Sequence, residues 1–251
     1  MPWSLKRSGI GAGADDPHTT GMCGRYTIHT GGDLLSGRFG VSGPAPETSP
    51  RFNAAPLQSL PVVRFNAADS QRHLSLLRWG LVPSWAKDTS IASKLINARG
   101  ETLTEKASFK TAFKKRRCLV PADAFYEWRK EGSTKQPFAI TTTDNGPFAM
   151  AGLWEGWRDP TTGEWLHTYT IVTTSANALL ADLHDRMPVI LPQSCWSAWL
   201  GEEEASEADL VGMLAPYDAE RMRVWPVSRD VGNVRNDRAD LLEPRPQITL
   251  V

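Results

Sequence analysis

The chain has 251 residues, of which 41% are hydrophobic, and its 28 Lys and Arg residues balance its 28 Asp and Glu residues. A chain of this length and composition can bury one substantial hydrophobic core. Its balanced charge excludes an overall electrostatic field that attracts nucleic acid, so any nucleic-acid-binding site must be a local basic patch. No apolar run approaches the ~20 residues that span a bilayer, and three cysteines without a Cys-x-x-Cys pair argue against a disulfide framework or a structural zinc site.

The few cysteines also suit a reducing compartment, so we expect a cytoplasmic protein with no membrane contact and no bound metal. The sequence lacks the Gly-x-x-x-x-Gly-Lys-Ser/Thr phosphate loop, the His-Glu-x-x-His zinc motif and the Gly-x-Ser-x-Gly nucleophile turn. Several common enzyme classes are therefore unsupported, and we expect no cofactor.

Residues 1–21 differ in composition from the rest of the chain. They are rich in Gly, Asp, Pro and Thr and lack the apolar stretch of a signal peptide. We predict that these residues are a disordered leader. Either the protein starts at Met22, or the leader is removed.

Alternating and apolar runs predict the elements of the domain that follows. In chain order, strands are expected at 26–29, 60–65, 73–79, 118–120, 125–128, 137–142, 147–153 and 168–174, and helices at 31–39, 177–183, 194–200 and 205–214. Many short strands with few helices indicate an α+β fold, in one compact domain with a curved antiparallel sheet system and peripheral helices.

Cys23 directly precedes the first predicted strand, and its chemistry depends on where the protein begins. At an internal position, a small buried strand residue is the ordinary interpretation. If the chain begins at Met22 and the methionine is removed, Cys23 carries a free α-amine beside its thiol. This 1,2-aminothiol can condense with an aldehyde and close a thiazolidine ring, because an α-amine with a pKa near ~8 is partly neutral at physiological pH.

Two further features allow two interpretations each. Trp79 and Trp85 flank a loop broken by glycine and proline, and they are either core residues or a platform on which bases stack. Residues 110–117 contain the strongest basic cluster, which is either a solvated helix face or a binding patch.

Three polar residues are candidates for chemistry. Asn97 follows an apolar pair, Glu127 lies between Tyr126 and Trp128, and His184 lies at a predicted helix-to-strand junction. Glu127 is either the outward residue of a half-buried strand or, if it points inward, an acid or base. His184 is either structural or part of a site, and the sequence does not show whether the three lie together.

Seven motifs that occur in order carry a family resemblance. They are Met-Cys-Gly-Arg-Tyr at 22–26, Arg-Phe-Asn-Ala-Ala-Pro at 51–56, Trp-Gly-Leu-Val-Pro-Ser-Trp at 79–85, Ile-Asn-Ala-Arg-Gly-Glu-Thr at 96–102, Phe-Tyr-Glu-Trp at 125–128, Leu-His-Asp-Arg-Met-Pro at 183–188 and Val-Ser-Arg-Asp-Val-Gly-Asn-Val at 227–234. Together they closely resemble the SOS response-associated peptidase (SRAP) family, whose members crosslink to abasic sites in single-stranded DNA. The resemblance places the domain at 22–243, with a tail at 244–251, and implies a β-barrel-like core with a basic groove.

The resemblance also implies roles for the candidate residues. Cys23 would attack C1′ of the open abasic sugar with its amine and then close a thiazolidine with its thiol. Glu127 would act as acid and base, His184 would protonate the departing sugar oxygen and help reversal, and Asn97 would hold the hydrogen-bond geometry. The resemblance also implies the contacts with DNA. Arg25, Arg99 and Arg186 would bind phosphates, and a base would lie against Trp79. Asn53 would bind DNA near the cysteine.

The 21 residues before Met22 depart from this family pattern, because an internal Cys23 has no free amine. We expect a monomer that shields abasic single-stranded DNA and associates with the nucleoid when the DNA is damaged. Self-removal of the leader would fit the peptidase activity that the family name implies. Two alternatives stay open: a thiol hydrolase or peptidase that uses Cys23 and His184, and a module that binds single strands or modified bases without covalent chemistry.

Overall fold

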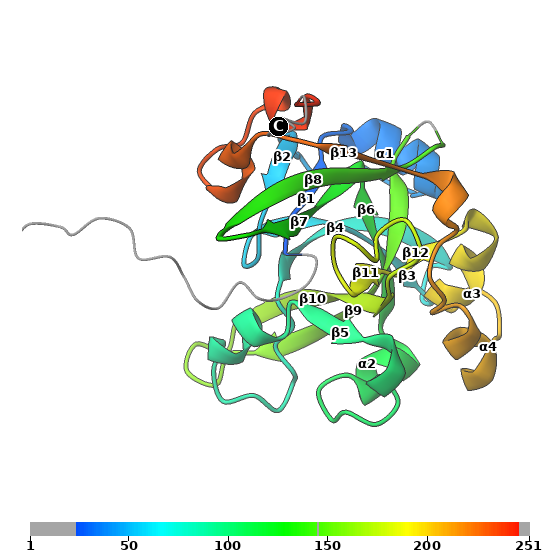
Figure 1. Cartoon of the computed structure of the whole chain (residues 1–251). Coiled ribbons are helices and arrows are strands. Elements are labelled where there is room, and N and C mark those ends of the chain that lie inside the picture. Colours follow the sequence, from blue (N-terminus) through cyan, green and yellow to red (C-terminus); the bar gives the residue numbers. More distant parts are fainter. Residues whose placement is uncertain (1–23, 145, 246–251) are drawn as a thin grey trace, which may run out of the picture.

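Five strands close on themselves into a barrel (Figure 1). The structure is a computed structural model that describes residues 24–144 and 146–245. The barrel consists of β3 (Ser59–Asn66), β4 (Gln71–Trp79), β6 (Arg117–Ala122), β9 (Phe148–Arg158) and β10 (Trp165–Ser175). β3 pairs with β4 and β6, β6 with β9, β9 with β10, and β10 returns to β4. The predicted α+β fold with a barrel-like core in one compact domain is confirmed.

One joint of the barrel differs from the predicted antiparallel arrangement. β10 and β4 run parallel, with Tyr169 opposite Trp79, whereas the other four joints are antiparallel. A tight hairpin forces neighbouring strands to be antiparallel, but β4 and β10 are far apart in the chain and no turn constrains them. The barrel is therefore mixed.

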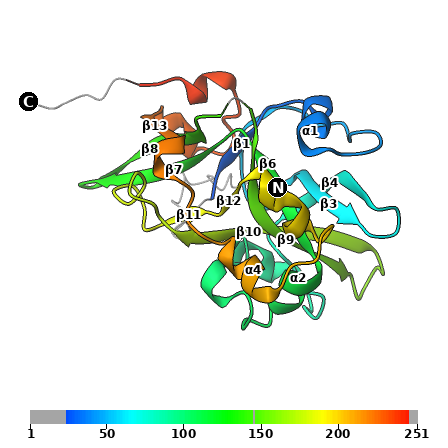
Figure 2. The same ribbon diagram turned by 90° about the vertical axis from the view of Figure 1, so that its right-hand side faces the viewer.

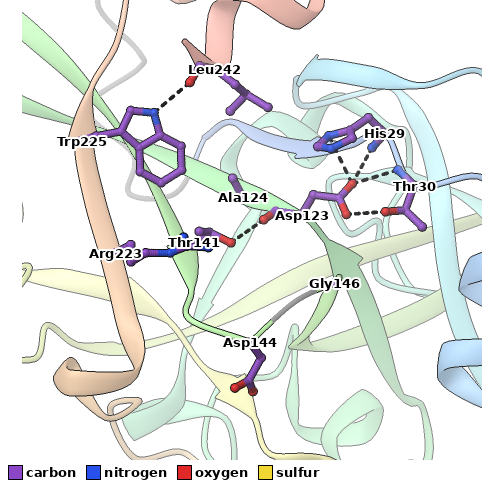
Figure 3. Close-up of a pocket in the computed structure, with 10 residues that line it drawn as sticks. All are labelled: His29, Thr30, Asp123, Ala124, Thr141, Asp144, Gly146, Arg223, Trp225 and Leu242. Carbon is purple, nitrogen blue, oxygen red and sulfur yellow. Dashed lines mark hydrogen bonds and ion pairs between the residues drawn. The ribbon is translucent and has the colours of Figure 1, made fainter. Parts of the chain in front are cut away.

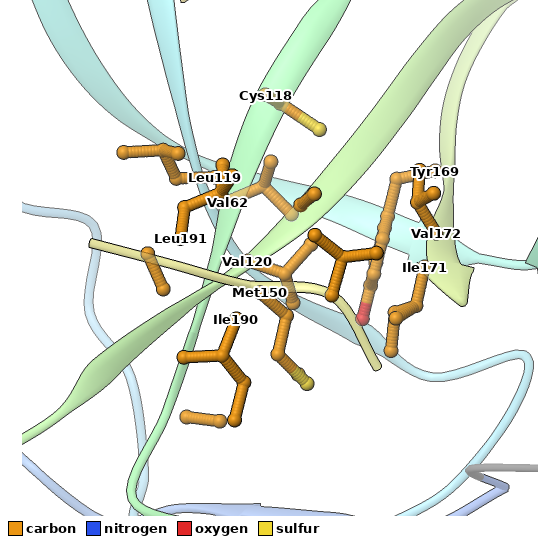
Figure 4. Packing of buried hydrophobic residues seen from close by; sticks show 14 of the residues in the cluster. Val62, Cys118, Leu119, Val120, Met150, Tyr169, Ile171, Val172, Ile190 and Leu191 are labelled. Carbon is orange, nitrogen blue, oxygen red and sulfur yellow. The ribbon is translucent and has the colours of Figure 1, made fainter. Parts of the chain in front are cut away.

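Apolar side chains from the barrel strands gather into one cluster (Figure 4). Val62 on β3, Leu119 on β6, Met150 on β9 and Ile171 on β10 are all buried. Burying an apolar side chain of this size contributes about 1.5–3 kcal/mol relative to leaving it in water. Burial of this cluster therefore contributes to the stability of the closed ring.

The second sheet is antiparallel throughout and lies beside the barrel. Its order is β13 (Met222–Pro226), β8 (Thr134–Thr142), β7 (Ala124–Glu131), β1 (Tyr26–Ile28) and β2 (Arg51–Ala54). A single residue, Asp123, separates β6 of the barrel from β7 of this sheet. The chain thus passes directly from one sheet to the other, and the first strand β1 lies between β7 and the edge strand β2.

Short strands and helices surround these two sheets. β5 (Asn97–Arg99) and β11 (Arg186–Pro188) pair with β10, and β12 (Ile190–Leu191) pairs with β9. The helices are α1 (Gly32–Phe39), α2 (Lys110–Lys115), α3 (Trp196–Leu200) and α4 (Glu207–Gly212), with 3-10 turns η1 (Ser90–Lys94), η2 (Gly100–Thr102), η3 (Gln193–Cys195), η4 (Ala219–Arg221), η5 (Arg229–Gly232) and η6 (Ala239–Leu242). Figures 1 and 2 place α1 at one end of the molecule and α2 at the other. Within the described ranges no helix has the length and apolar character to cross a membrane.

The helix predicted at 177–183 is wrong, because this segment consists of hydrogen-bonded turns. The Asn177 side chain accepts a hydrogen bond from the Leu180 amide at 3.1 Å and donates to the Tyr217 carbonyl oxygen at 2.7 Å. An asparagine that bonds the backbone ahead of it stabilises a turn in competition with a helix. His184 therefore follows a turn, not a helix.

Candidate active site

Strand β1 directs the start of the described chain towards Glu127. Cys23 and the predicted leader lie outside the described residues, and Gly24 is the first residue of the described chain. In the antiparallel pairing of β1 with β7, Tyr26 lies opposite Phe125, and the Tyr126 amide donates to the Arg25 carbonyl oxygen at 3.0 Å. Extended by two residues from the Tyr26–Phe125 pair, this register would set Gly24 opposite Glu127. The start of the described chain therefore leads towards the predicted acid and base.

Glu127 is a buried carboxylate, with 4% of its surface exposed. β7 begins with four buried residues, because it lies between β1 and β8 in the sheet and is covered on both faces. The interpretation of Glu127 as the outward residue of a half-buried strand is therefore wrong. A carboxyl group is buried in a protein only where hydrogen bonds or charges compensate for its lost hydration.

Tyr26 fixes β1 to the barrel at this point. Its hydroxyl lies 2.8 Å from the hydroxyl of Tyr169, and its ring meets Trp79 edge to face with centroids 5.2 Å apart. Burial raises the pKa of Tyr26 well above its ordinary value, so the phenol stays neutral. Because the Trp79 indole N–H donates to the Ile96 carbonyl oxygen at 2.9 Å, the same cluster also places Asn97, the first residue of β5.

The structure contradicts the predicted stacking of a base on Trp79. This ring has no exposed surface and lies between Tyr26 and Tyr169, the latter stacked with centroids 6.3 Å apart. The parallel β4–β10 joint sets Trp79 opposite Tyr169, which the sequence pattern did not indicate. Trp85, at the other end of the same loop, is 60% exposed. One tryptophan is thus core and the other is on the surface.

The turn after Trp79 requires glycine. Gly80 has φ +117°, and a Cβ there would lie 2.7 Å from the carbonyl oxygen of Ala92. Both the backbone conformation and the close approach exclude other residues. Gly80 therefore seats η1 and the segment leading to Asn97 against the end of β4.

Arg25 and Asn53 contact each other and the C-terminal part of the chain. Arg25 Nη1 donates to Asn53 Oδ1 at 3.0 Å, and the guanidinium also donates to the carbonyl oxygens of Val231 and Gly232. Asn53 is 1% exposed, and its amide nitrogen lies within 3.1 Å of three backbone carbonyl oxygens. A DNA contact by Asn53 is therefore contradicted, because both of its polar atoms are engaged and buried.

Arg99 and Arg186 lie on two strands that flank β10. Arg99 on β5 is exposed and pairs in register with Thr173. Arg186 on β11 pairs with Ser175, and its guanidinium forms a bidentate pair with Glu101 and donates to the Thr173 carbonyl oxygen at 2.9 Å. The two arginines are thus brought to one end of the barrel, although they are 87 positions apart in the sequence (186 − 99).

His184 lies two residues before Arg186, in the turn that leads into β11. Its Nδ1 accepts a hydrogen bond from the Arg186 amide at 3.1 Å and lies 2.8 Å from Asp185 Oδ1. The first contact needs an unprotonated Nδ1 and the second needs a proton there. His184 is therefore held within its own turn, between the backbone of Arg186 and the carboxylate of Asp185.

The basic cluster at 110–117 divides between surface and interior. Lys110, Lys114 and Lys115 lie on the surface of α2. Arg116 forms an ion pair with the buried Glu155 at 2.7 Å, and Arg117 donates to three backbone carbonyl oxygens. The cluster therefore provides fewer free cations than its sequence indicates.

A hollow of about 310 Å³ lies elsewhere, on the second sheet (Figure 3). Its floor holds Asp123, whose carboxylate accepts hydrogen bonds from the amides of His29 and Thr30 and from the Thr30 hydroxyl. These bonds fix the junction of β6 and β7 to the end of β1. No described residue of the predicted site lines the hollow.

Other chemistries find little support in the described ranges. No group of three or more His, Cys, Asp or Glu side chains there is arranged to hold a metal ion. Cys118 is buried in the barrel wall, where burial raises the pKa of its thiol far above the ordinary value. A neutral buried thiol is a poor nucleophile.

Known proteins resemble this chain along most of its length. The family described as SOS response associated peptidase (SRAP) matches residues 22–234. The abasic site processing protein YoqW of Bacillus subtilis is 42% identical over 225 residues, covering 88% of this chain and 99% of that protein. The abasic site processing protein HMCES of Xenopus tropicalis is 35% identical over 221 residues, covering 79% of this chain and 65% of that protein.

The fold has a counterpart among solved structures. A crystal structure of a protein from Bacteroides thetaiotaomicron superposes with a TM-score of 0.80 at 27% identity, covering 89% of this chain and all of that one. The family match spans the seven motifs and both sheets. The chain belongs to the SOS response associated peptidase (SRAP) family.

Proposed function

We propose that this protein binds single-stranded DNA and forms a covalent thiazolidine with abasic sites through Cys23. The observation that supports the proposal is the β1–β7 register, in which Tyr26 lies opposite Phe125; extended two residues towards the start of the chain, this register would set Gly24 opposite the buried Glu127. The relatives named abasic site processing proteins support the choice of substrate.

The proposed chemistry needs no metal and no oxidant. The neutral α-amine of Cys23 adds to C1′ of the ring-opened sugar, and the carbinolamine loses one water to form an imine. The thiol then adds across the C=N bond, so that sulfur bonds to C1′ and its proton goes to nitrogen. One water is lost in total, and no phosphodiester bond breaks.

Glu127, His184 and Asn97 supply the proton transfers and the positioning in this proposal. Glu127 takes a proton from the nitrogen once the amine has added to C1′, and it delivers one to the departing hydroxyl. His184, in the turn that leads into β11, protonates the sugar oxygen during ring opening and helps to reverse the adduct. Asn97 orients the substrate from β5.

Local cations hold the DNA backbone in this proposal. Arg99 is exposed, and Arg186 lies at the same end of the barrel. We expect the affinity for single-stranded DNA to fall with salt, with a slope of roughly −0.7 per phosphate contacted, and Arg99→Ala to flatten it by one contact. An unchanged slope in Arg99→Ala and Arg186→Ala would move the DNA path, with the lysines of α2 as the next candidates.

The segment before Met22 decides whether the amine exists. We propose that residues 22–243 are the working domain, that residues 1–21 are a leader and that 244–251 are a tail. A start at Met22 is the simpler route to a free Cys23, and removal of the leader by the protein itself is the other.

The test is the intact mass of protein mixed with abasic or ordinary single-stranded DNA. The form expressed from Met22, with Cys23 as its first residue, should gain the mass of the abasic strand less one water and gain nothing from the ordinary strand. The 251-residue form should form no adduct unless it is trimmed. Efficient adduct formation by an untrimmed 251-residue chain would refute the aminothiol mechanism.

Two control variants separate the alternatives. Cys23→Ser keeps the amine but not the thiol, so its imine should be trapped only with a reducing agent. A thiol hydrolase would be active even with Cys23 at an internal position, because it needs no free amine. A non-covalent binding module would form no adduct with abasic DNA, and its Cys23→Ala variant would retain the DNA affinity.

A further inference from the structure

The motif at 227–234 has no task in the chemistry described so far, yet it lies against the start of β1. Residues 229–237, which we name the C-terminal clamp, begin with η5 and end at Asp237. The clamp contacts Arg25, the residue directly before β1, and it contacts β2 through Phe52 and Asn53. It thereby joins a segment near the end of the chain to the strand that leads to Cys23.

Asn53 is the centre of these contacts. Its Nδ2 donates towards the carbonyl oxygens of Val231, Asn233 and Asn236, at 3.1, 3.1 and 2.8 Å. Its Oδ1 accepts from Arg25 at 3.0 Å. One buried amide group therefore holds three carbonyl groups of the clamp and the side chain of Arg25, the residue before β1, in a fixed relation, and an unsatisfied donor here would be costly.

Arg25 completes the connection from the β1 side. Its Nη1 donates to the Val231 carbonyl oxygen at 2.8 Å, and its Nη2 donates to that of Gly232 at 3.2 Å. A guanidinium presents several donors in a rigid plane, so contacts to Asn53 and two carbonyl groups fix its orientation and, with it, the backbone of residues 24–26.

Asp237 holds the clamp to β2 from the other side. Its Oδ1 accepts from the backbone amides of Phe52 and Asn53 at 2.6 and 3.1 Å. The Tyr126 hydroxyl, on the strand that carries Glu127, donates to the Phe52 carbonyl oxygen at 2.8 Å. The clamp, β2 and β7 are thus linked beside the start of β1.

We propose that the C-terminal clamp, acting through Asn53 and Arg25, positions the start of β1 so that Cys23 reaches the abasic sugar beside Glu127. This rests on the proposed function. It makes Arg25 and Asn53 positioning residues and not phosphate contacts. The consequence is that loosening the clamp slows adduct formation without weakening DNA binding, because a misplacement of about 1 Å can cost about 10²-fold in rate.

The experiment compares Asn53→Asp, Asp237→Ala and Asp237→Asn in the form that gives the adduct, with Asn66→Asp as control. Asn53→Asp keeps the contact with Arg25 but cannot donate to the three carbonyl groups. Asp237→Ala removes the acceptor of two backbone amides, and Asp237→Asn keeps one oxygen for them. Asn66 is an exposed asparagine on β3, remote from the clamp, so it tests the same chemical change without effect on β1.

Single-turnover rates are measured against DNA concentration. Asn53→Asp and Asp237→Ala should lower the maximal rate at least about tenfold. The DNA concentration that gives half of the maximal rate, and the slope of the salt dependence, should stay within about twofold of the values for the unaltered protein. Asp237→Asn should recover most of the rate, and Asn66→Asp should leave it unchanged. Loss of DNA affinity in parallel with rate would overturn the proposal and assign the clamp and Arg25 to DNA binding.

Hydrogen exchange of the free protein tests the clamp without DNA. Peptides covering 24–28 and 229–237 should exchange faster in Asn53→Asp, while peptides from β9 and β10 keep their protection. Unchanged exchange at 24–28 would refute a link from the clamp to β1. If Asn53→Asp fails to fold, the two Asp237 variants still decide the question. If the unaltered protein forms no adduct, the proposed function is refuted. The link between the clamp and β1 is then still decided by hydrogen exchange, because that measurement uses no DNA.

Discussion

Arg186 and Glu101 form a bidentate ion pair in which the arginine side chain is 11% exposed and the glutamate side chain is 54% exposed. The hydrogen bond from Arg186 lowers the pKa of Glu101 below its ordinary value, so the carboxylate is charged at neutral pH. Since Glu101 occupies both terminal nitrogens of the guanidinium, a DNA phosphate that reaches Arg186 competes with this carboxylate.

Glu101→Gln should therefore increase the affinity for single-stranded DNA by about threefold to tenfold at low salt, because it removes a competing anion and a charge that repels phosphate. The measurement is fluorescence anisotropy across a salt series, with Glu105→Gln on the nearby surface as a control for the change in net charge. A loss of affinity in Glu101→Gln would mean that Glu101 orients Arg186 for the phosphate and does not compete with it.

Glu127 and His184 should have separable roles. Glu127→Gln keeps the shape of the buried side chain but cannot transfer a proton, so adduct formation should slow by about 10²-fold or more. His184→Ala should form the adduct more slowly and release it poorly, because reopening the ring also needs a proton at the sugar oxygen. Time courses of formation and of release into excess abasic DNA distinguish the two, and equal losses in both steps for both variants would contradict this division.

The two tryptophans of the 79–85 loop should differ in their effect on stability. Trp79→Ala removes a ring with no exposed surface and should lower the free energy of unfolding by about 3–5 kcal/mol. Trp85→Ala removes a ring that is 60% exposed and should change it by no more than about 0.5 kcal/mol. Urea titrations of both variants provide the comparison, and similar losses would show that Trp85 packs against the domain.

Stability should decline in acid partly through Glu202. Its hydrogen bond with Arg72 lowers the pKa of its carboxyl below the ordinary value of 4.5, so the folded state favours the charged form. A carboxyl group whose pKa is lowered by folding stabilises the protein fully at pH values above its ordinary pKa. The stabilisation is lost as the pH falls towards and through the lower pKa of the folded state. Glu202→Gln should reduce the fall in melting temperature between pH 5 and pH 3, and an unchanged fall would assign the acid sensitivity to other carboxyl groups.

Local patterns in the sequence were sufficient for most strands and for the class of fold. Short apolar or alternating runs marked both β3 and β4, since this signal lies within the few residues of the strand itself. The seven motifs indicated the family, and the family match over residues 22–234 confirms it. The predicted helix at 31–39 corresponds to α1, whose end is marked by Gly40 in the left-handed conformation.

Contacts between distant segments decided the rest. Trp79 is core because the parallel β4–β10 joint and β1 enclose its ring, and no local pattern reports such a joint. Asn53 is a buried structural amide because three carbonyl groups of the C-terminal clamp, about 180 residues later, converge on it. The burial of Glu127 was likewise settled by β1 and β8 on either side of β7. A sequence states which groups a residue carries, but whether those groups meet water, DNA or another part of the chain depends on pairings that only the tertiary structure makes.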